Sequence, residues 1–188
     1  MLILQTSIFL LCKCRYRLGV GGTPQSFVRA GLLGLPLMVA IIGGQTRSFR
    51  PLIDLYKKAW TQGDSHPQHN HQLKVGIHSL GYVAESAKEA VEDFYPGYAC
   101  SMNKIGKGRG WHKITRTAFD AQRGPEGALL VGDPEEIAEK IIRHSKSLRG
   151  ISRITFMMNA SASSHEKFMQ AIKLIGTRFA PALRKEIG

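Results

Sequence analysis

Acidic residues are scarce in this chain. Its 188 residues include 14 Asp and Glu against 26 Lys and Arg, which gives a net charge of +12. Such an excess invites a nucleic-acid interpretation. The cations are spread along the chain, however, and we find neither a compact basic run interleaved with aromatics nor a zinc-finger spacing. We therefore expect a solvated basic surface that attracts anionic cofactors, with nucleic-acid binding as the minor alternative.

Cysteine is rare as well, with three residues at positions 12, 14 and 100. An odd number of cysteines without a recurring spacing does not make the framework of a disulfide-rich protein. Cys12 and Cys14 are too close together, and too poor in neighbouring ligands, to indicate a metal site. The cysteine pattern therefore predicts a reducing, cytoplasmic environment and no metal cofactor.

A membrane-length apolar run is missing too. The apolar segment Met1–Leu11 is too short to cross a bilayer. Lys13, Arg15 and Arg17 follow this segment, whereas a secretory signal carries its cations in front and a small-residue cleavage site behind. We therefore predict neither a targeting segment nor a membrane partner.

The chain does contain an alternation of short apolar and longer amphipathic segments. Its composition, 43% hydrophobic and 21% charged, is typical of one globular domain. The pattern predicts strands at Tyr16–Val20, Leu37–Ile42, Leu73–His78, Leu129–Val131 and Arg153–Met158, and helices at Pro24–Leu33, Phe49–Thr61, Ser86–Tyr95, Thr115–Gln122, Pro134–Ser147 and His165–Phe179. Repeated strand–helix pairs form right-handed parallel βα units. About four such units fit either an open doubly wound sheet or half of an eight-stranded barrel.

The segment Gly21–Ser26 joins the first predicted strand to the first predicted helix. Gly21 and Gly22 have no side chains, so a ligand can approach their backbone closely. Thr23 suits the N-cap, and Pro24 suits the first helical position. The free amides and the positive end of the helix dipole favour a phosphate, with the Ser26 hydroxyl nearby. An ordinary, well-capped strand-to-helix turn explains the same residues equally simply.

Seven stretches of the chain occur together in the order of one known family. They are Val20–Ala30, Gly34–Met38, Ala40–Gly44, Phe49–Tyr56, Phe94–Pro96, Gly127–Glu136 and His165–Lys167. In these stretches the sequence resembles the bacterial-luciferase-like family of flavin-dependent monooxygenases and oxidoreductases. The resemblance implies an α/β fold, a partial TIM-like (β/α)₈ barrel made of about four C-terminal βα units with parallel strands. It covers residues 18–188 and leaves residues 1–17 as a segment outside the family pattern.

The resemblance also implies a function and its partners. Family members bind a flavin, usually FMN and in some branches a deazaflavin, at the C-terminal mouth of the barrel. By matched position, Gly21, Gly22, Thr23 and Ser26 would grip the cofactor phosphate. The resemblance further implies a small organic substrate, a flavin reductase as partner, and a reaction of reduced flavin with O₂. Since the match begins near the fifth barrel strand, we expect a truncated member, and a non-catalytic, self-associating half-barrel that keeps only the phosphate-binding turn is the alternative.

Two further features are expected at the mouth of the barrel. His78 closes the third predicted strand, where a neutral imidazole could contact flavin or substrate or act as a base. It is the weak catalytic candidate, and a packed or solvated histidine is the simpler interpretation. Gly43 and Gly44 end the second strand and either leave room for the flavin or merely form a turn.

Three other clusters have simple structural explanations. His66, His69 and His71 lie in a helix-to-strand loop, on the face of a barrel opposite the active site, without an acidic or cysteine partner. The carboxylates of Asp133–Glu136 are explained by helix capping. Met102–Trp111, with Lys104, Lys107 and Arg109, is expected to be a loop, either a mobile lid or plain surface.

Overall fold

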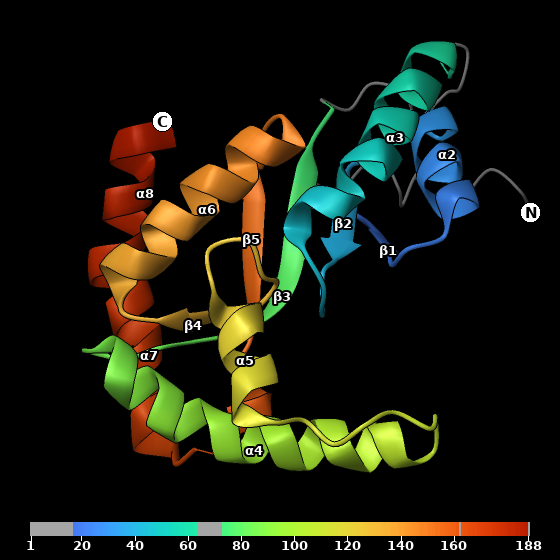
Figure 1. The fold of residues 1–188 in the computed structure, drawn as a ribbon. Coiled ribbons are helices and arrows are strands. Elements are labelled where there is room, and N and C mark those ends of the chain that lie inside the picture. Colours follow the sequence, from blue (N-terminus) through green and yellow to red (C-terminus); the bar gives the residue numbers. More distant parts are fainter. Residues whose placement is uncertain (1–16, 64–72, 162, 188) are drawn as a thin grey trace, which may run out of the picture.

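The computed structural model describes residues 17–63, 73–161 and 163–187 (Figure 1). Its elements follow in the order β1 (Leu18–Val20), α2 (Pro24–Leu32), β2 (Leu37–Ala40), the 3₁₀ turn η1 (Thr46–Phe49), α3 (Arg50–Gln62), β3 (Val75–Val83), α4 (Ala87–Lys107), α5 (Arg116–Arg123), β4 (Leu130–Gly132), α6 (Pro134–Leu148), β5 (Arg153–Met157), the 3₁₀ turn η2 (Asn159–Ser161), α7 (His165–Leu174), the π turn η3 (Ile175–Phe179) and α8 (Ala180–Ile187). Strands and helices alternate along most of the chain, as the sequence predicts. None of the described helices is both long and apolar enough for a membrane span.

The strands form one parallel sheet. β1 pairs with β2, β2 pairs with Val75–His78 of β3, β5 pairs with Gly76–Leu80, and β4 pairs with Gly81–Val83. Within the described residues, β1, β4 and β5 each pair with one strand only and are edge strands. The predicted α/β fold of parallel βα units, a partial barrel, is confirmed.

The two faces of the sheet differ in how well they are covered. One face carries the row Val20, Val39 and Ile77, and these side chains pack in a core together with α2, α3 and α6. The next row is Ala40, His78 and Thr155, all only half-buried. The alternation follows from the strand period of two, since neighbouring residues point to opposite faces. In a closed barrel the second face would line the interior.

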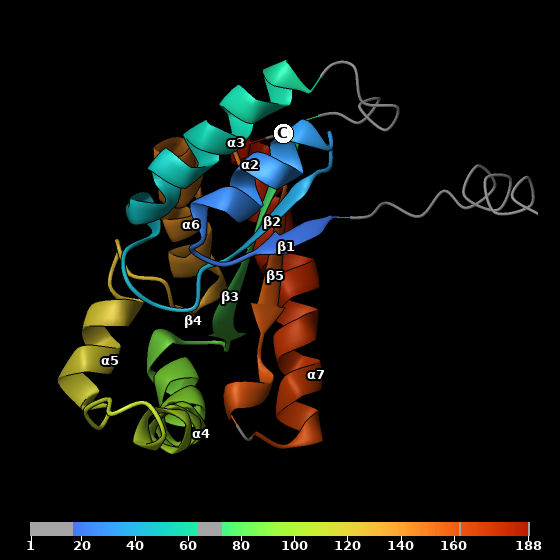
Figure 2. The ribbon, with the colours of Figure 1, turned by 90° about the vertical axis from the view of Figure 1, so that its right-hand side faces the viewer.

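A second core lies at the carboxyl ends of the strands. Figure 2 shows the arrowheads of β3 and β5 pointing towards α4. The ring of Tyr82 stacks on Phe94 with centroids 6.2 Å apart, and Phe94 stacks on Tyr98 at 5.8 Å. Phe119 of α5 lies against both Phe94 and Tyr98 and is fully buried. These rings join α4 and α5 to the end of β3.

The predicted end of α4 is wrong. The sequence predicts a helix that stops at Tyr95 and a loop from Met102, yet α4 continues through Pro96 to Lys107. Packing explains the difference, because Phe94 and Tyr98 are both buried on one face of the continuing helix. Gly97 brings α4 so close to the backbone of η2 that a Cβ at this position would collide with it.

Candidate functional site

The Gly21–Ser26 turn lies at the carboxyl end of the edge strand β1. Gly21, Gly22 and Thr23 are exposed, and a Cβ at either glycine would meet no atom within 4 Å. Neither glycine has a positive φ, so the turn does not require glycine for its backbone conformation. Because the two glycines have no side chain, a ligand can approach the main chain of the turn directly.

Several donors of this turn are available to a ligand. Thr23 occupies the N-cap of α2 as predicted, but its hydroxyl makes no capping hydrogen bond. The Ser26 amide donates to the Thr23 carbonyl at 3.0 Å, and is therefore already used. Within the described residues, no acceptor is bound to the amides of Gly22, Thr23 and Gln25. An anion placed here would meet free N–H groups at the positive end of the helix dipole.

The start of α2 carries no acidic side chain, and the helix itself is firmly packed. No Asp or Glu occurs in the sequence before Asp54, and the first turn of α2 has no acidic side chain. α2 is held in place by close packing, since a Cβ on Gly31 would collide with the main chain of α3 at Tyr56 and Trp60. The Tyr56 hydroxyl in turn donates to the Leu35 carbonyl at 3.1 Å, and burial raises the pKa of this tyrosine. The donors of the turn therefore stand on a rigid helix pair.

Gly44 follows β2 at the same end of the sheet and has a structural role. Its φ of +80° requires a glycine-like conformation, and its amide donates to Gln122 Oε1 at 3.0 Å. Gln45 and Gly127 form an isolated antiparallel bridge next to it. The Gly43–Gly44 segment thus ties β2 to the loop before β4.

His78 does not lie where the sequence places it. β3 continues to Val83, so His78 is the fourth of nine residues in the strand and not its last. Its Nδ1 is 2.7 Å from Thr155 Oγ1, on the half-buried face of the sheet. The strand continues because β5 pairs with it as far as Leu80 and β4 pairs with Gly81–Val83, which the sequence pattern around Gly81 does not reveal.

The structure gives a different outcome for each of the remaining predicted clusters. Asp133 caps α6 by accepting the Glu136 amide at 2.9 Å, and Glu136 pairs with Arg123 at 2.9 Å, so the capping interpretation is confirmed. The expected loop is short and begins at Gly108, and the Arg109 guanidinium stacks 5.1 Å from the ring of the exposed Trp111. The three-histidine cluster at positions 66, 69 and 71 lies outside the described residues. Among residues 17–63, 73–161 and 163–187, no group of three ligand-type side chains could hold a metal ion.

The sequence reasoning missed two buried titratable residues on α6. Lys140 Nζ donates to the carbonyls of Leu129 at 2.6 Å and Arg123 at 2.9 Å, and burial lowers its pKa to about 7. His144 lies one turn further, with Nδ1 3.4 Å from Thr46 Oγ1. Burial, reinforced by the charge of Lys140, lowers the pKa of His144 to about 4. No sequence signal separates these residues from the exposed polar face of a helix.

A hydrogen-bonded group at the end of β3 was also missed. The Tyr82 hydroxyl donates to Asp93 Oδ2 at 3.3 Å, and Asp93 forms an ion pair with Lys167. Burial, with the nearby Asp93 charge, raises the pKa of Tyr82 to about 12. This group joins α4 to α7 and therefore holds the second core together.

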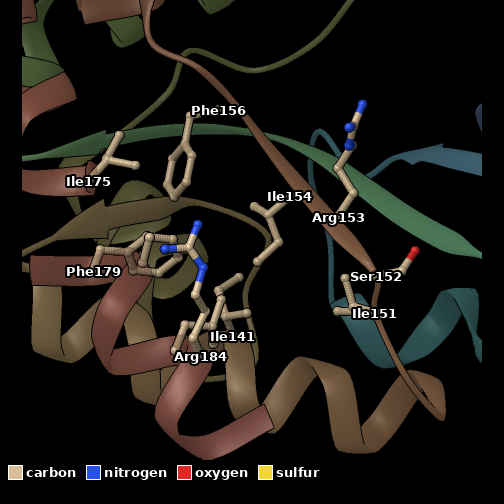
Figure 3. A pocket seen from close by; sticks show the side chains of 11 residues that line it. Ile141, Ile151, Ser152, Arg153, Ile154, Phe156, Ile175, Phe179 and Arg184 are labelled. Carbon is tan, nitrogen blue, oxygen red and sulfur yellow. The ribbon is translucent and has the colours of Figure 1, made fainter. Parts of the chain in front are cut away.

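A groove opens at the other edge of the sheet, between β5, α6 and α8 (Figure 3). It encloses about 400 Å³ and is lined mainly by apolar side chains, namely Ile141, Ile151, Ile154, Phe156, Ile175, Phe179, Ala180 and Leu183, with Ser152, Arg153 and Arg184. This groove lies on the helix-covered side of β5, whereas the Gly21–Ser26 turn follows β1. The two features are therefore separate.

The described sheet and its helices superpose on part of several solved structures. The chain superposes on monooxygenase RslO1 from Streptomyces bottropensis with a TM-score of 0.65 and 18% identity, over 89% of this chain and 47% of that one. It superposes on the oxygenating constituent of 3,6-diketocamphane monooxygenase from Pseudomonas putida, solved with FMN, with a TM-score of 0.57 and 16% identity, over 88% and 47%. For the coenzyme F420-dependent tetrahydromethanopterin reductase from Methanopyrus kandleri, the TM-score is 0.59 and the identity 14%, over 90% and 51%.

The first of these neighbours is a monooxygenase, the second was solved with FMN and the third is F420-dependent, so the resemblance expected from the sequence is confirmed at the level of the fold. The chain spans about half the length of each of them. Neither the protein-family models nor the curated proteins give a match to this chain.

Proposed function

We propose that this chain binds the phosphate of FMN, or of a deazaflavin, at the Gly21–Ser26 turn and serves a flavin-dependent oxidoreductase or monooxygenase. The observation that carries the proposal is the set of amides at Gly22, Thr23 and Gln25, which have no acceptor among the described residues and lie at the start of α2 beneath open space. Backbone N–H groups at a helix N-terminus are a common phosphate site. The shared fold supports this proposal, because one neighbour was solved with FMN and another is F420-dependent.

The residues of the turn would have distinct tasks. Gly22 and Thr23 would donate backbone N–H groups, and the hydroxyls of Thr23 and Ser26 would add side-chain donors to the phosphate oxygens. The flavin ring would supply the redox chemistry, and the protein would position it and a small organic substrate at the mouth. A flavin reductase would provide the reduced cofactor. We assign no catalytic side chain, and His78 remains a weak candidate on the open face of the sheet.

A titration of the purified chain with FMN, AMP and inorganic phosphate tests this proposal. Quenching of flavin fluorescence reports FMN binding, and competition reports the other two ligands. We expect FMN to bind more tightly than AMP and phosphate, because the ring adds contacts beyond the turn. No binding of any of the three would overturn the proposal.

A second function is favoured by the open sheet. β1, β4 and β5 are edge strands in the described structure, and open edges promote association with further strands. The second proposal is therefore a non-catalytic, self-associating half-barrel that retains only an anion-binding turn. Equal and weak binding of FMN, AMP and phosphate by an oligomer would support this proposal against the first. Light scattering gives the oligomeric state in the same samples.

A further inference from the structure

The groove between β5 and α8 has the composition of a lipid-type site. Most of its lining is apolar, and the rings of Phe156 and Phe179 meet edge to face at 5.5 Å on its wall. Ile141, which is fully buried, closes it on the α6 side. Its volume of about 400 Å³ lies within the range of roughly 300–1,000 Å³ that is usual for small-molecule pockets.

One charged group stands over this apolar surface. In Figure 3 the Arg184 side chain rises beside Phe179 towards Phe156, and its guanidinium lies above the apolar lining. Within the described residues, Arg184 has no acidic partner, whereas Arg178 of the preceding turn pairs with Glu85 and Glu135, each at 2.8 Å. Arg184 is exposed at the opening of the groove, where its guanidinium can bind a carboxylate through two parallel hydrogen bonds.

Arg153, the second arginine of the groove, has a side chain that points in another direction than that of Arg184. Arg153 lies on the rim, but Figure 3 shows its guanidinium pointing away from the apolar residues. Like Arg184, it has no ion-pair partner among the residues that the structure describes. The two arginines carry the same charge at the same groove, so they form a matched pair for testing the role of direction.

We propose that this groove binds a single-chain amphiphile with an anionic head, of the medium-chain carboxylate class. The alkyl chain lies against Ile154, Phe156 and Leu183, and the carboxylate meets Arg184 at the opening. Charge complementarity carries this choice of ligand, because among the described residues the groove offers a cation without an ion-pair partner and no acidic side chain in its lining. The site is independent of the flavin proposal, since it shares no residue with the Gly21–Ser26 turn.

Isothermal titration of the full chain with dodecanoate, dodecanol and hexanoate, all below micelle-forming concentrations, tests the proposal. We expect dodecanoate to bind best. Dodecanol lacks the charge, and hexanoate lacks most of the apolar contact area, so each should bind at least tenfold more weakly. Equal affinity for dodecanoate and dodecanol would overturn the proposal, because the arginine would then have no role.

Two variants assign the binding to the groove. Arg184→Glu should lower the affinity for dodecanoate at least tenfold, while Arg153→Glu, with the same change in net charge, should lower it less than threefold. Equal losses in the two variants would mean general attraction of an anion to a basic protein, and would overturn the site. Circular dichroism confirms that both variants are folded.

Two other occupants of the groove are separated by the same samples. If a second copy covers the groove, light scattering will show a dimer that Ile175→Asp dissociates, and dodecanoate will not bind the dimer. If residues 1–16 cover it, dodecanoate will bind only after their deletion. Either result would overturn the proposal, whereas binding of dodecanoate to the intact monomer supports it.

Discussion

Two regions at opposite edges of one sheet, the turn after β1 and the groove beside β5, are suited to anions through different kinds of donor. The turn after β1 offers backbone amides and a helix dipole, with no charged side chain among its members. The groove beside β5 offers a guanidinium above apolar side chains. Backbone donors suit a compact phosphate, and an arginine over a hydrophobic wall suits an amphiphile. The two proposed anion sites therefore differ in ligand class because their donors differ.

The largest effect is expected for Gly22→Asp, which places a negative charge among the free amides. A Cβ at this position meets no atom within 4 Å, so the fold should persist. We expect the affinity for FMN to fall on the order of 100-fold, because the carboxylate repels the phosphate and occupies its donors. Dodecanoate binding in the groove should not change. Gly19→Asp, in the same strand–turn region with equal open space, is the matched control.

The pH dependence of stability should be nearly as large, and it comes from α6. Lys140 of this helix binds the loop before β4, and the neighbouring Ile141 closes the groove. Burial lowers the pKa of Lys140 from 10.5 to about 7, so between these values the unfolded chain holds a proton that the folded chain has lost. Stability therefore rises with pH in this window, by about 2 kcal/mol between roughly pH 7 and 9.

Urea unfolding at about pH 7 and about pH 9 measures this change of the unfolding free energy with pH. Lys140→Met should remove most of it, because the substituted side chain does not titrate. A slope that survives in this variant would assign the pH dependence to other groups.

A smaller effect is expected from filling the groove. Ala180→Leu extends a side chain into the space beside Phe179 and Ile175. It should weaken dodecanoate binding about tenfold, equivalent to roughly 1.4 kcal/mol, and leave FMN binding unchanged. Parallel titrations with both ligands check this, and a parallel loss of FMN affinity would show that the two regions are coupled.

The smallest effect is expected at His78. Its hydrogen bond to Thr155 lies on a half-buried face, so Thr155→Val should cost about 1 kcal/mol of unfolding free energy. If the bond has only a structural role, His78→Gln should leave FMN affinity within twofold of the unsubstituted chain. A larger loss of FMN affinity in His78→Gln than in Thr155→Val would give His78 a place in the flavin site.

The two regions also differ in how far the sequence predicts them. The Gly21–Ser26 turn is contiguous, and the N-cap position of Thr23 and the start of α2 follow from local rules. The groove gathers residues from α6, β5 and α8, which are distant in sequence, so no local pattern indicates it. The length of β3 and the end of α4 escape prediction for the same reason, because packing against other elements decides both.

β3 pairs with three other strands, and this has a kinetic consequence. Its partner in β5 lies 77 residues further along the chain at the His78–Thr155 contact. Closing so long a loop costs chain entropy before any pairing energy is recovered, and non-local parallel pairing of this kind slows folding. We expect the join of β3 and β5 to be the late step of folding, and the amides of β3 to exchange with solvent more slowly than those of the edge strand β1.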